Sequence, residues 1–313
     1  MKKKYILGVI LLAVVTLTAC NSDKISDTSI FPNVPVLDSS LYTYPFDKFL
    51  YDSLVVPYNI AFQYKLGDET TDMDYNLVPC KYNLSQQVAC AVKYLWIDVY
   101  GKQINPEFLK LYAPRIINVL GSPAINAEQQ TEVLGVAEGG FKITLYNMNG
   151  FNLKNMAWMN QYIFHVMHHE FSHILHQTKS FPKEYERISA GKYDSQGWQY
   201  HSDEEAYAMG FVTPYSMVEA HEDFVEVISS YITDTRAVWA KRGFEMAEDH
   251  THIVSVNEDQ EGTATIQLKI NYCKNWLMEK YNYSLDSIRA EVQRRQDNLS
   301  EEVVMNQLYK YYN

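Results

Sequence analysis

The sequence predicts an α+β domain that is mostly helical and has a small mixed sheet beside one central helix. The strongest observation is residues 155–177, where apolar side chains recur at helical spacing without a glycine or proline. Similar spacing recurs in several segments after residue 202. Residues 116–120 and 141–146 adjoin glycine or proline, and the second segment alternates apolar and polar residues, which is typical of a strand.

The start of the chain is typical of an exported lipoprotein. Three lysines follow Met1, an apolar stretch follows them, and Leu-Thr-Ala precedes Cys20. The apolar stretch is too short to span a membrane, and the whole pattern describes a secretory signal. The Leu-Thr-Ala-Cys sequence resembles the bacterial lipobox, in which the cysteine becomes the lipidated first residue. We therefore predict a signal peptide over residues 1–19, a flexible tether over 20–45 and one domain over 46–313.

Charge and cysteine content exclude several classes of function. The formal charge of the chain is −11, and removing the three N-terminal lysines makes it −14. Such an acidic domain argues against nucleic acid as a partner and against electrostatic binding to anionic lipid. Beyond Cys20 the chain has only Cys80, Cys90 and Cys273, an odd number without metal-binding spacing. We expect these three to be free, mostly buried thiols.

The other elements are predicted from start and stop signals. Ser85 is typical of a helix N-cap, so we expect a helix over residues 85–99 that ends at Gly101. Asn105 before Pro106 predicts a short helix that reaches residue 112. Further helices are expected at residues 183–188, 203–207, 219–234, 236–247, 263–280 and 284–297, and loops at residues 65–74 and 178–201.

The central helix contains His169-Glu170-Phe171-Ser172-His173, an H-E-x-x-H pattern. Residues four apart lie on one face of a helix, so both imidazoles can reach one metal ion with Glu170 beside it. A zinc hydrolase needs two such nitrogen ligands, an open position for water and a carboxylate that accepts the water's proton. The sequence therefore predicts Zn²⁺ as cofactor, His169 and His173 as ligands, and Glu170 as general base.

A third ligand is needed, and three carboxylates are candidates. The metzincin pattern would require glycine at position 176 and histidine at 179, which this chain lacks. Glu222 is the favoured candidate, because Glu226 lies one turn further along the same helix and could orient a ligand histidine. Asp223 and Glu205 remain alternatives. Glu205 belongs to three consecutive acids, which more often mark a solvated helix start.

Four further histidines are interpreted without a metal. His165 and His176 fall within about 40° of the face that carries the motif, at ~100° per residue. They could line the cleft or orient a ligand, but we expect ordinary packing or exposure, since the zinc needs only three protein ligands. We expect His168 to be structural, and we assign no role to His221.

Three segments carry a resemblance to a known family. They are residues 168–177 (HHEFSHILHQ), Thr213-Pro214-Tyr215 and Glu222-Asp223-Phe224-Val225-Glu226. They resemble a family of Bacteroidota lipoproteins that are zinc metallohydrolases associated with substrate import. Such proteins often occur with TonB-dependent transporters and starch-utilisation-type binding lipoproteins. The resemblance covers the signal and residues 140–235, and implies a zincin-like metallopeptidase domain anchored in the outer membrane, facing the periplasm or the cell surface.

A second resemblance concerns the ligand helix. Residues 222–226 resemble the second zinc helix of anthrax lethal factor, a gluzincin in which a second acid follows the ligand Glu by one turn. That enzyme places a Tyr seven residues before its ligand Glu, and Tyr215 holds this position here. The resemblance implies that Tyr215 donates a hydrogen bond to the oxyanion. In zincins a strand before the zinc helix often pairs with extended substrate, and strand 141–146 is its counterpart by analogy.

These observations predict a lipid-anchored zinc metallohydrolase outside the cytoplasm, acting on a peptide or protein substrate. A second possibility is a zinc hydrolase that acts on another carbonyl or on a glycan-linked amide. A third is a binding lipoprotein of a nutrient-uptake system in which zinc is not catalytic. The presence of Glu170 argues against the third, because a structural zinc site has no need of a base.

Overall fold

A computed structural model describes residues 37–67, 75–126, 131–138 and 140–312. The chain divides into two compact units, Met1–Leu41 and Tyr42–Asn313, and the second contains all of the named helices and strands. The predicted signal peptide and Cys20 lie outside the described residues. In the described part, no helix is both long and apolar enough to cross a membrane.

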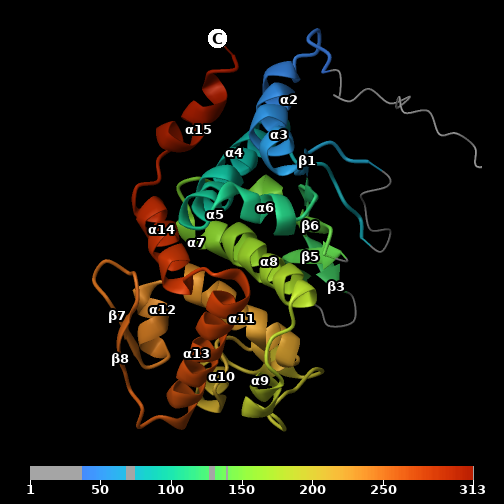
Figure 1. Ribbon diagram of the computed structural model, residues 1–313. Helices are drawn as coiled ribbons and strands as arrows, with labels where there is room; N and C mark the ends of the chain where they lie inside the picture. The colour runs from blue at the N-terminus through green and yellow to red at the C-terminus, as the bar shows by residue number, and fades with distance from the viewer. Residues whose placement is uncertain (1–36, 68–74, 127–130, 139, 313) are drawn as a thin grey trace, which may run out of the picture. The chain divides into compact units, whose positions relative to one another are not determined.

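The helical run that carries the H-E-x-x-H pattern passes through the middle of the second unit (Figure 1). It comprises α7 (Met156–Met159), the π-helical turn η5 (Asn160–Phe164) and α8 (His165–Thr178). The side chain of Asn155 caps its first turn by accepting a backbone N–H. The helix predicted over residues 155–177 is therefore confirmed. Strands β5 and β6 pack against α8, and helix α11 also packs against it.

A four-stranded mixed sheet lies beside α8 (Figure 1), in the order β1-β2-β6-β5. The first three strands are parallel, and β5 is antiparallel to β6. Their bounds are β1 Ala61–Gln63, β2 Ile116–Val119, β5 Gly135–Glu138 and β6 Lys142–Leu145. Strands β3 (Ala124–Asn126) and β4 (Thr131–Val133) form a separate antiparallel pair. The predicted α+β class with a small mixed sheet is confirmed.

The sheet corrects the expectation that strand 141–146 pairs with extended substrate. Strand β6 covers most of that segment, but it pairs with β2 on one side and β5 on the other. An interior strand has no free edge for a substrate. The edge is formed by β5, which pairs with no described strand on its other side. It approaches α8 so closely that a Cβ on Gly135 would lie 2.2 Å from Cγ1 of Val166.

The N-terminal helices cover one side of this core. One of them shows that the helix predicted over residues 85–99 has the wrong ends. Helix α4 begins at Tyr82 and runs without a break through η3 into α5, so Ser85 and Gly101 lie inside the run rather than at its ends. Ser85 bonds back to the carbonyl of Lys81 instead of capping. The bounds are α2 Tyr44–Leu50, η1 Tyr51–Val55, α3 Val56–Tyr58, α4 Tyr82–Val92, η3 Lys93–Ile97, α5 Asp98–Gln103, α6 Pro106–Tyr112 and η4 Met148–Gly150.

The C-terminal half is mostly helical. The helix predicted at residues 236–247 is wrong in its second half: α12 ends at Lys241, and β7 follows and pairs with β8. The other predicted helices are present. The bounds are α9 Lys183–Ile188, η6 Trp198–Tyr200, α10 Asp203–Met209, η7 Tyr215–Met217, α11 Ala220–Thr233, α12 Arg236–Lys241, β7 Phe244–Met246, β8 Ile253–Val256, α13 Glu261–Tyr281, α14 Leu285–Asp297 and α15 Glu301–Tyr309.

Two buried ionic groups fix the positions of these helices. Lys269 on α13 lies 2.7 Å from Asp223 on α11, and both side chains are fully buried. Glu291 on α14 is 4% exposed and accepts hydrogen bonds from three basic side chains. We call this group the Glu291 cluster; its basic members are Lys102, Arg294 and Arg295. The three cysteines are free and buried, as predicted.

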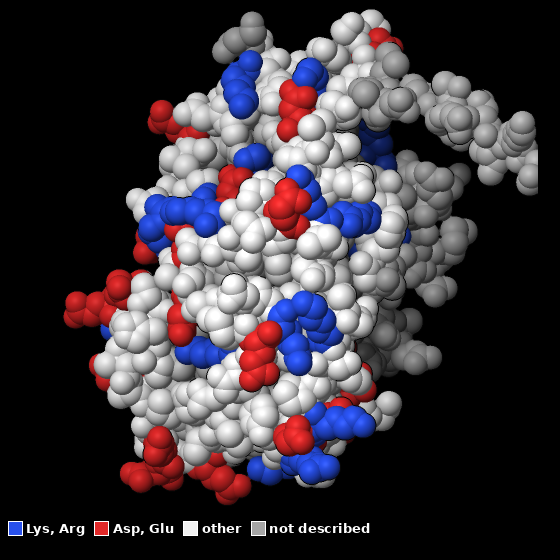
Figure 2. Space-filling model, in the orientation of Figure 1, with Lys and Arg blue, Asp and Glu red and all other residues white. Residues whose placement is uncertain are grey.

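The surface charge is mixed on the face that Figure 2 shows. Acidic and basic side chains lie in small groups beside one another there, rather than gathering by sign. Oppositely charged side chains are paired at several places on the protein, for example Lys274 with Asp286 at 2.8 Å. Opposite charges this close compensate each other's field, so this face is not dominated by one sign.

Candidate metal centre

Three side chains from α8 and α11 converge on one point. Nε2 of His169 lies 3.1 Å from Nε2 of His173 and 3.1 Å from Oε2 of Glu222. The third side of the triangle, from His173 to Glu222, is 3.3 Å. Tetrahedral zinc with bonds of about 2.0–2.1 Å places its ligand atoms about 3.3 Å apart. The donor set and its spacing therefore fit a zinc ion bound by two imidazoles and one carboxylate.

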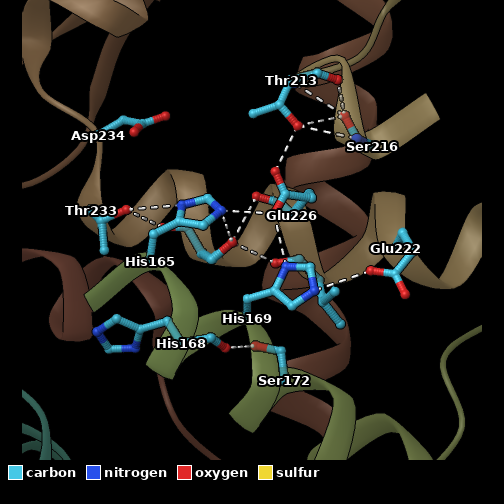
Figure 3. Close-up of polar contacts among 12 residues, drawn as sticks. His165, His168, His169, Ser172, Thr213, Ser216, Glu222, Glu226, Thr233 and Asp234 are labelled. Carbon is cyan, nitrogen blue, oxygen red and sulfur yellow. Dashed lines mark hydrogen bonds and ion pairs between the residues drawn. The ribbon is translucent and has the colours of Figure 1, made fainter. Parts of the chain in front are cut away.

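A second carboxylate contacts the ring nitrogen of His169 that faces away from the metal position (Figure 3). Oε1 of Glu226 lies 2.8 Å from Nδ1 of His169, so the ring lies between Glu226 and Glu222. The other oxygen of Glu226 accepts a hydrogen bond from the hydroxyl of Thr213 at 2.6 Å. With Nε2 facing the metal position, Nδ1 carries the proton and donates a hydrogen bond to Glu226. Such a contact fixes the tautomer and orientation of a metal ligand.

His165 joins the same carboxylate, and this corrects the expectation of ordinary packing. Its Nε2 lies 2.7 Å from Oε1 of Glu226 (Figure 3). His165, His169 and Glu226 thus form a second cluster that could hold a metal. Their 2.7–2.8 Å spacings are those of charge-assisted hydrogen bonds and are shorter than ligand atoms on one zinc ion would show. We assign this cluster to hydrogen bonding.

His176 also departs from expectation. Its Nε2 lies 2.9 Å from Nδ1 of His173, the nitrogen that faces away from the metal position. His168 is structural, as predicted: it is fully buried, and its Nδ1 lies 2.9 Å from the hydroxyl of Tyr100. His221 stacks on His176 with ring centroids 5.3 Å apart. The angular position of His176 was visible in the sequence, but its partner was not.

The two alternative third ligands point elsewhere. Asp223 is fully buried, and its carboxylate contacts Lys269 at 2.7 Å and the hydroxyl of Tyr193 at 3.1 Å. Glu205 is exposed and forms a capping box with Ser202 at the start of α10. Both carboxylates are therefore engaged away from the two histidines. Of the three carboxylates considered from the sequence, only Glu222 reaches both ring nitrogens.

The charges at this centre keep the two carboxylates ionised. Burial lowers the pKa of His169, but Glu222 and Glu226 outweigh burial and raise that pKa, so a metal ion must displace the proton on its Nε2. Burial alone would raise the pKa of Glu222, but the neighbouring His169 and His173 lower it to about 2. Burial likewise opposes ionisation of Glu226, yet His165 and His169 hold its pKa well below the usual range. Both carboxylates are therefore ionised at neutral pH. Glu222 offers a negative oxygen to a cation, and Glu226 offers an acceptor to the ring behind it.

A cavity of about 760 Å³ opens onto the centre. His169, Glu170 and Tyr215 line it, and so does Gly135 at the start of the edge strand β5. Glu170 is 8% exposed. Tyr215 lies on η7, with its ring centroid 5.9 Å from that of His169. Burial and then the carboxylates of the site raise the pKa of Tyr215, so its hydroxyl keeps its proton and can donate a hydrogen bond.

The sequence alone does not show the contacts of two residues that line the cavity. Trp198 on η6 lines the cavity and packs edge-on against Tyr215, with centroids 5.1 Å apart. Thr213 also lines it and ties the segment before Tyr215 to Glu226. Neither residue shares a periodic pattern with the motif helix. Only the fold brings them to the site.

Comparisons with known proteins identify the class. Residues 40–286 match the profile of a family described as "Putative zinc-binding metallo-peptidase". The chain belongs to this family. A crystal structure from Bacteroides caccae, described in the same words, is 36% identical with a TM-score of 0.68; the match covers 87% of this chain and 97% of that one. No curated protein matches the chain. Membership in this zinc-binding metallo-peptidase family supports the predicted zinc cofactor and the predicted fold.

Proposed function

We propose that this member of the zinc-binding metallo-peptidase family is an active peptidase whose zinc is held by His169, His173 and Glu222. The observation that carries the proposal is the convergence of these three donor atoms, 3.1–3.3 Å apart, beside a cavity that His169 and Glu170 both line. Zinc in such a site acidifies a water molecule and polarises a carbonyl group.

The protein's own groups then handle the proton and the developing charge. Glu170 stands next to His169 in the chain and lines the same cavity. It accepts the proton of the attacking water and passes it to the leaving amine. Tyr215, whose raised pKa keeps it protonated, donates a hydrogen bond to the oxyanion of the tetrahedral intermediate. Glu226 holds the ring of His169 throughout.

The edge strand β5 offers a place for the peptide. Its start, Gly135, lines the cavity, and on its outer side it pairs with no described strand. An extended peptide can add to such an edge through main-chain hydrogen bonds, and its alternate side chains then face the cavity. This arrangement favours a peptide over a compact glycan amide. A purely zinc-binding role is not favoured, because it leaves Glu170 without a function.

The proposal includes the anchor predicted from the sequence. Lipidation at Cys20 would tether the domain to the outer membrane, facing the periplasm or the cell surface, and a link to TonB-dependent nutrient import follows from the family resemblance. The sequence motif alone supports this part. Metabolic labelling with a fatty acid tests it: label in the wild type and none in Cys20→Ala is expected, and an unlabelled wild type would contradict it.

The catalytic proposal is tested with Glu170→Gln on quenched-fluorescent peptide libraries. The variant is expected to keep one zinc per chain and to lose about 10²-fold or more in kcat, because it loses its general base. Glu204→Gln, an exposed acid on α10, is the matched control and should behave as the wild type. Glu222→Ala should lose zinc. A wild type that holds zinc but cleaves no peptide, or a fully active Glu170→Gln, would overturn the proposal.

A further inference from the structure

The two candidate histidine ligands differ in the group that their Nδ1 atoms contact. Nδ1 of His169 faces the carboxylate of Glu226, which is the usual kind of group behind a zinc-binding histidine. Nδ1 of His173 faces Nε2 of His176, another imidazole, at 2.9 Å. Among the described residues this is the one hydrogen bond that Nδ1 of His173 makes. The orientation of His173 therefore depends on a single neighbour.

The direction of this hydrogen bond follows from the proposed metal site. When Nε2 of His173 faces a metal ion, its proton must sit on Nδ1, which then donates. His176 must accept through an unprotonated Nε2. A backbone carbonyl or carboxylate could do the same, but none of the described groups reaches that nitrogen. His176 lies on the same helix, one turn further along, so α8 supplies both the ligand and the group behind it.

The surroundings of His176 hold its ring in place. Phe181 packs edge-on against it at a centroid distance of 5.5 Å, and His221 stacks on it at 5.3 Å with the rings nearly parallel; Phe181 and His221 also contact each other at 5.3 Å. Phe224 on α11 contributes a third ring at 6.5 Å. His176 is 9% exposed. A ring packed in this way keeps its Nε2 aimed at His173 at little further cost in side-chain entropy.

We infer that His176 is a positioning residue for zinc, which orients His173 by accepting the hydrogen bond from its Nδ1. The inference rests on the proposed metal site. It assigns to the third histidine of the sequence His169-x-x-x-His173-x-x-His176 a role in metal affinity without direct contact with the ion. Groups in this position typically change metal affinity by about 10–100-fold when they are removed.

The test compares three variants of the full chain by competition with a zinc chelator. His176→Phe keeps a packed ring but removes the acceptor, and it is expected to weaken zinc binding about 10–100-fold. His176→Gln places an amide oxygen near the position of Nε2, and it should restore affinity to within a few-fold of the wild type. His221→Phe keeps the stacking on His176 and should bind zinc as the wild type does.

Two further measurements separate positioning from structure. The visible spectrum of the Co²⁺-substituted protein should shift in His176→Phe and return toward the wild type in His176→Gln. The melting temperature of the metal-free protein should be similar in all three. Wild-type zinc affinity in His176→Phe would overturn the inference, as would an equal loss in His176→Gln or a parallel fall in metal-free stability.

These measurements do not depend on turnover. A protein that cleaves no peptide but shows the expected zinc affinities would contradict the peptidase proposal and leave the role of His176 standing. A wild type with no zinc site at all would overturn the proposed ligands and, with them, this inference.

Discussion

Replacing Asp223 by asparagine should destabilise the fold strongly without removing zinc. Asp223 and Lys269 are both fully buried, and they form an ion pair with a 2.7 Å contact. The substitution keeps the shape of the side chain but leaves the lysine buried without a counter-charge. Breaking a buried ion pair in this way costs about 3–5 kcal/mol. Lys269 keeps its 2.8 Å hydrogen bond to the carbonyl of Gly210, so we expect the lower end, about 3 kcal/mol.

The assay is equilibrium unfolding in urea at a fixed zinc concentration, because zinc bound only by the folded state adds to the apparent stability. A loss of about 3 kcal/mol corresponds to a melting temperature lower by about 6–12 °C in a domain of this size. The control is the double variant Asp223→Leu with Lys269→Met. It removes both charges, and it should lie within about 1 kcal/mol of the wild type, since apolar replacement of a buried pair is often neutral.

The variant Asp223→Asn also distinguishes Glu222 from Asp223 as the third zinc ligand. The carboxylate of Asp223 faces Lys269 and Tyr193, so folded Asp223→Asn should bind zinc as the wild type does. Glu222→Gln should lose zinc while keeping its stability in the metal-free state. Loss of zinc from a stable Asp223→Asn would move the third ligand by one residue. Wild-type stability in Asp223→Asn would show that the buried pair contributes nothing.

Three further predictions test other parts of the structure. Burial would raise the pKa of Glu291, but its basic partners lower it to about 2. Because two of these partners are half exposed and screened by water, about 1–2 kcal/mol of stability should be lost as pH falls from about 4.5 to 2, and Glu291→Gln should flatten this acid-unfolding profile. Gly210 has φ +92° and no space for a Cβ, so Gly210→Ala should cost about 1–3 kcal/mol in thermal unfolding, whereas Gly191→Ala, at φ +82° in open space, should cost less. Thr213→Val leaves an oxygen of buried Glu226 without its donor and should lower peptide turnover about 10-fold with zinc retained, with recovery in Thr213→Ser.

Local signals were sufficient to predict the helices of the centre. Residues 155–177 and 219–234 combine amphipathic spacing with paired acids or histidines four residues apart, and such spacing places side chains on one face of any helix. The geometry of His169 and His173 therefore follows from the sequence. The choice among Glu222, Asp223 and Glu205 does not, because it depends on a lysine 46 residues after Asp223 and on the Ser202 cap.

The errors arose where tertiary contacts override local preference. By local preference Ser85 begins a helix and Gly101 ends one. In the structure, however, the buried helical run through η3 starts before Ser85 and continues past Gly101. Strand β5 is short and begins with Gly135, so it gives no periodic signal, although its first residue lines the cavity. The hydrogen-bond partners of His165 and His176 could not be predicted from the sequence for a different reason. Helical angle gives the direction of a side chain but not the group that meets it.

The neighbouring acids of α11 explain how the centre is assembled. Successive residues on a helix point about 100° apart, so fixing Asp223 in the core also fixes the direction of Glu222. The buried pair with Lys269 anchors one side of α11, and Glu226 anchors another through its bond to His169. Both contacts form between protein groups alone. The position of Glu222 is therefore set before zinc binds, and the metal meets a preorganised site rather than having to turn the helix.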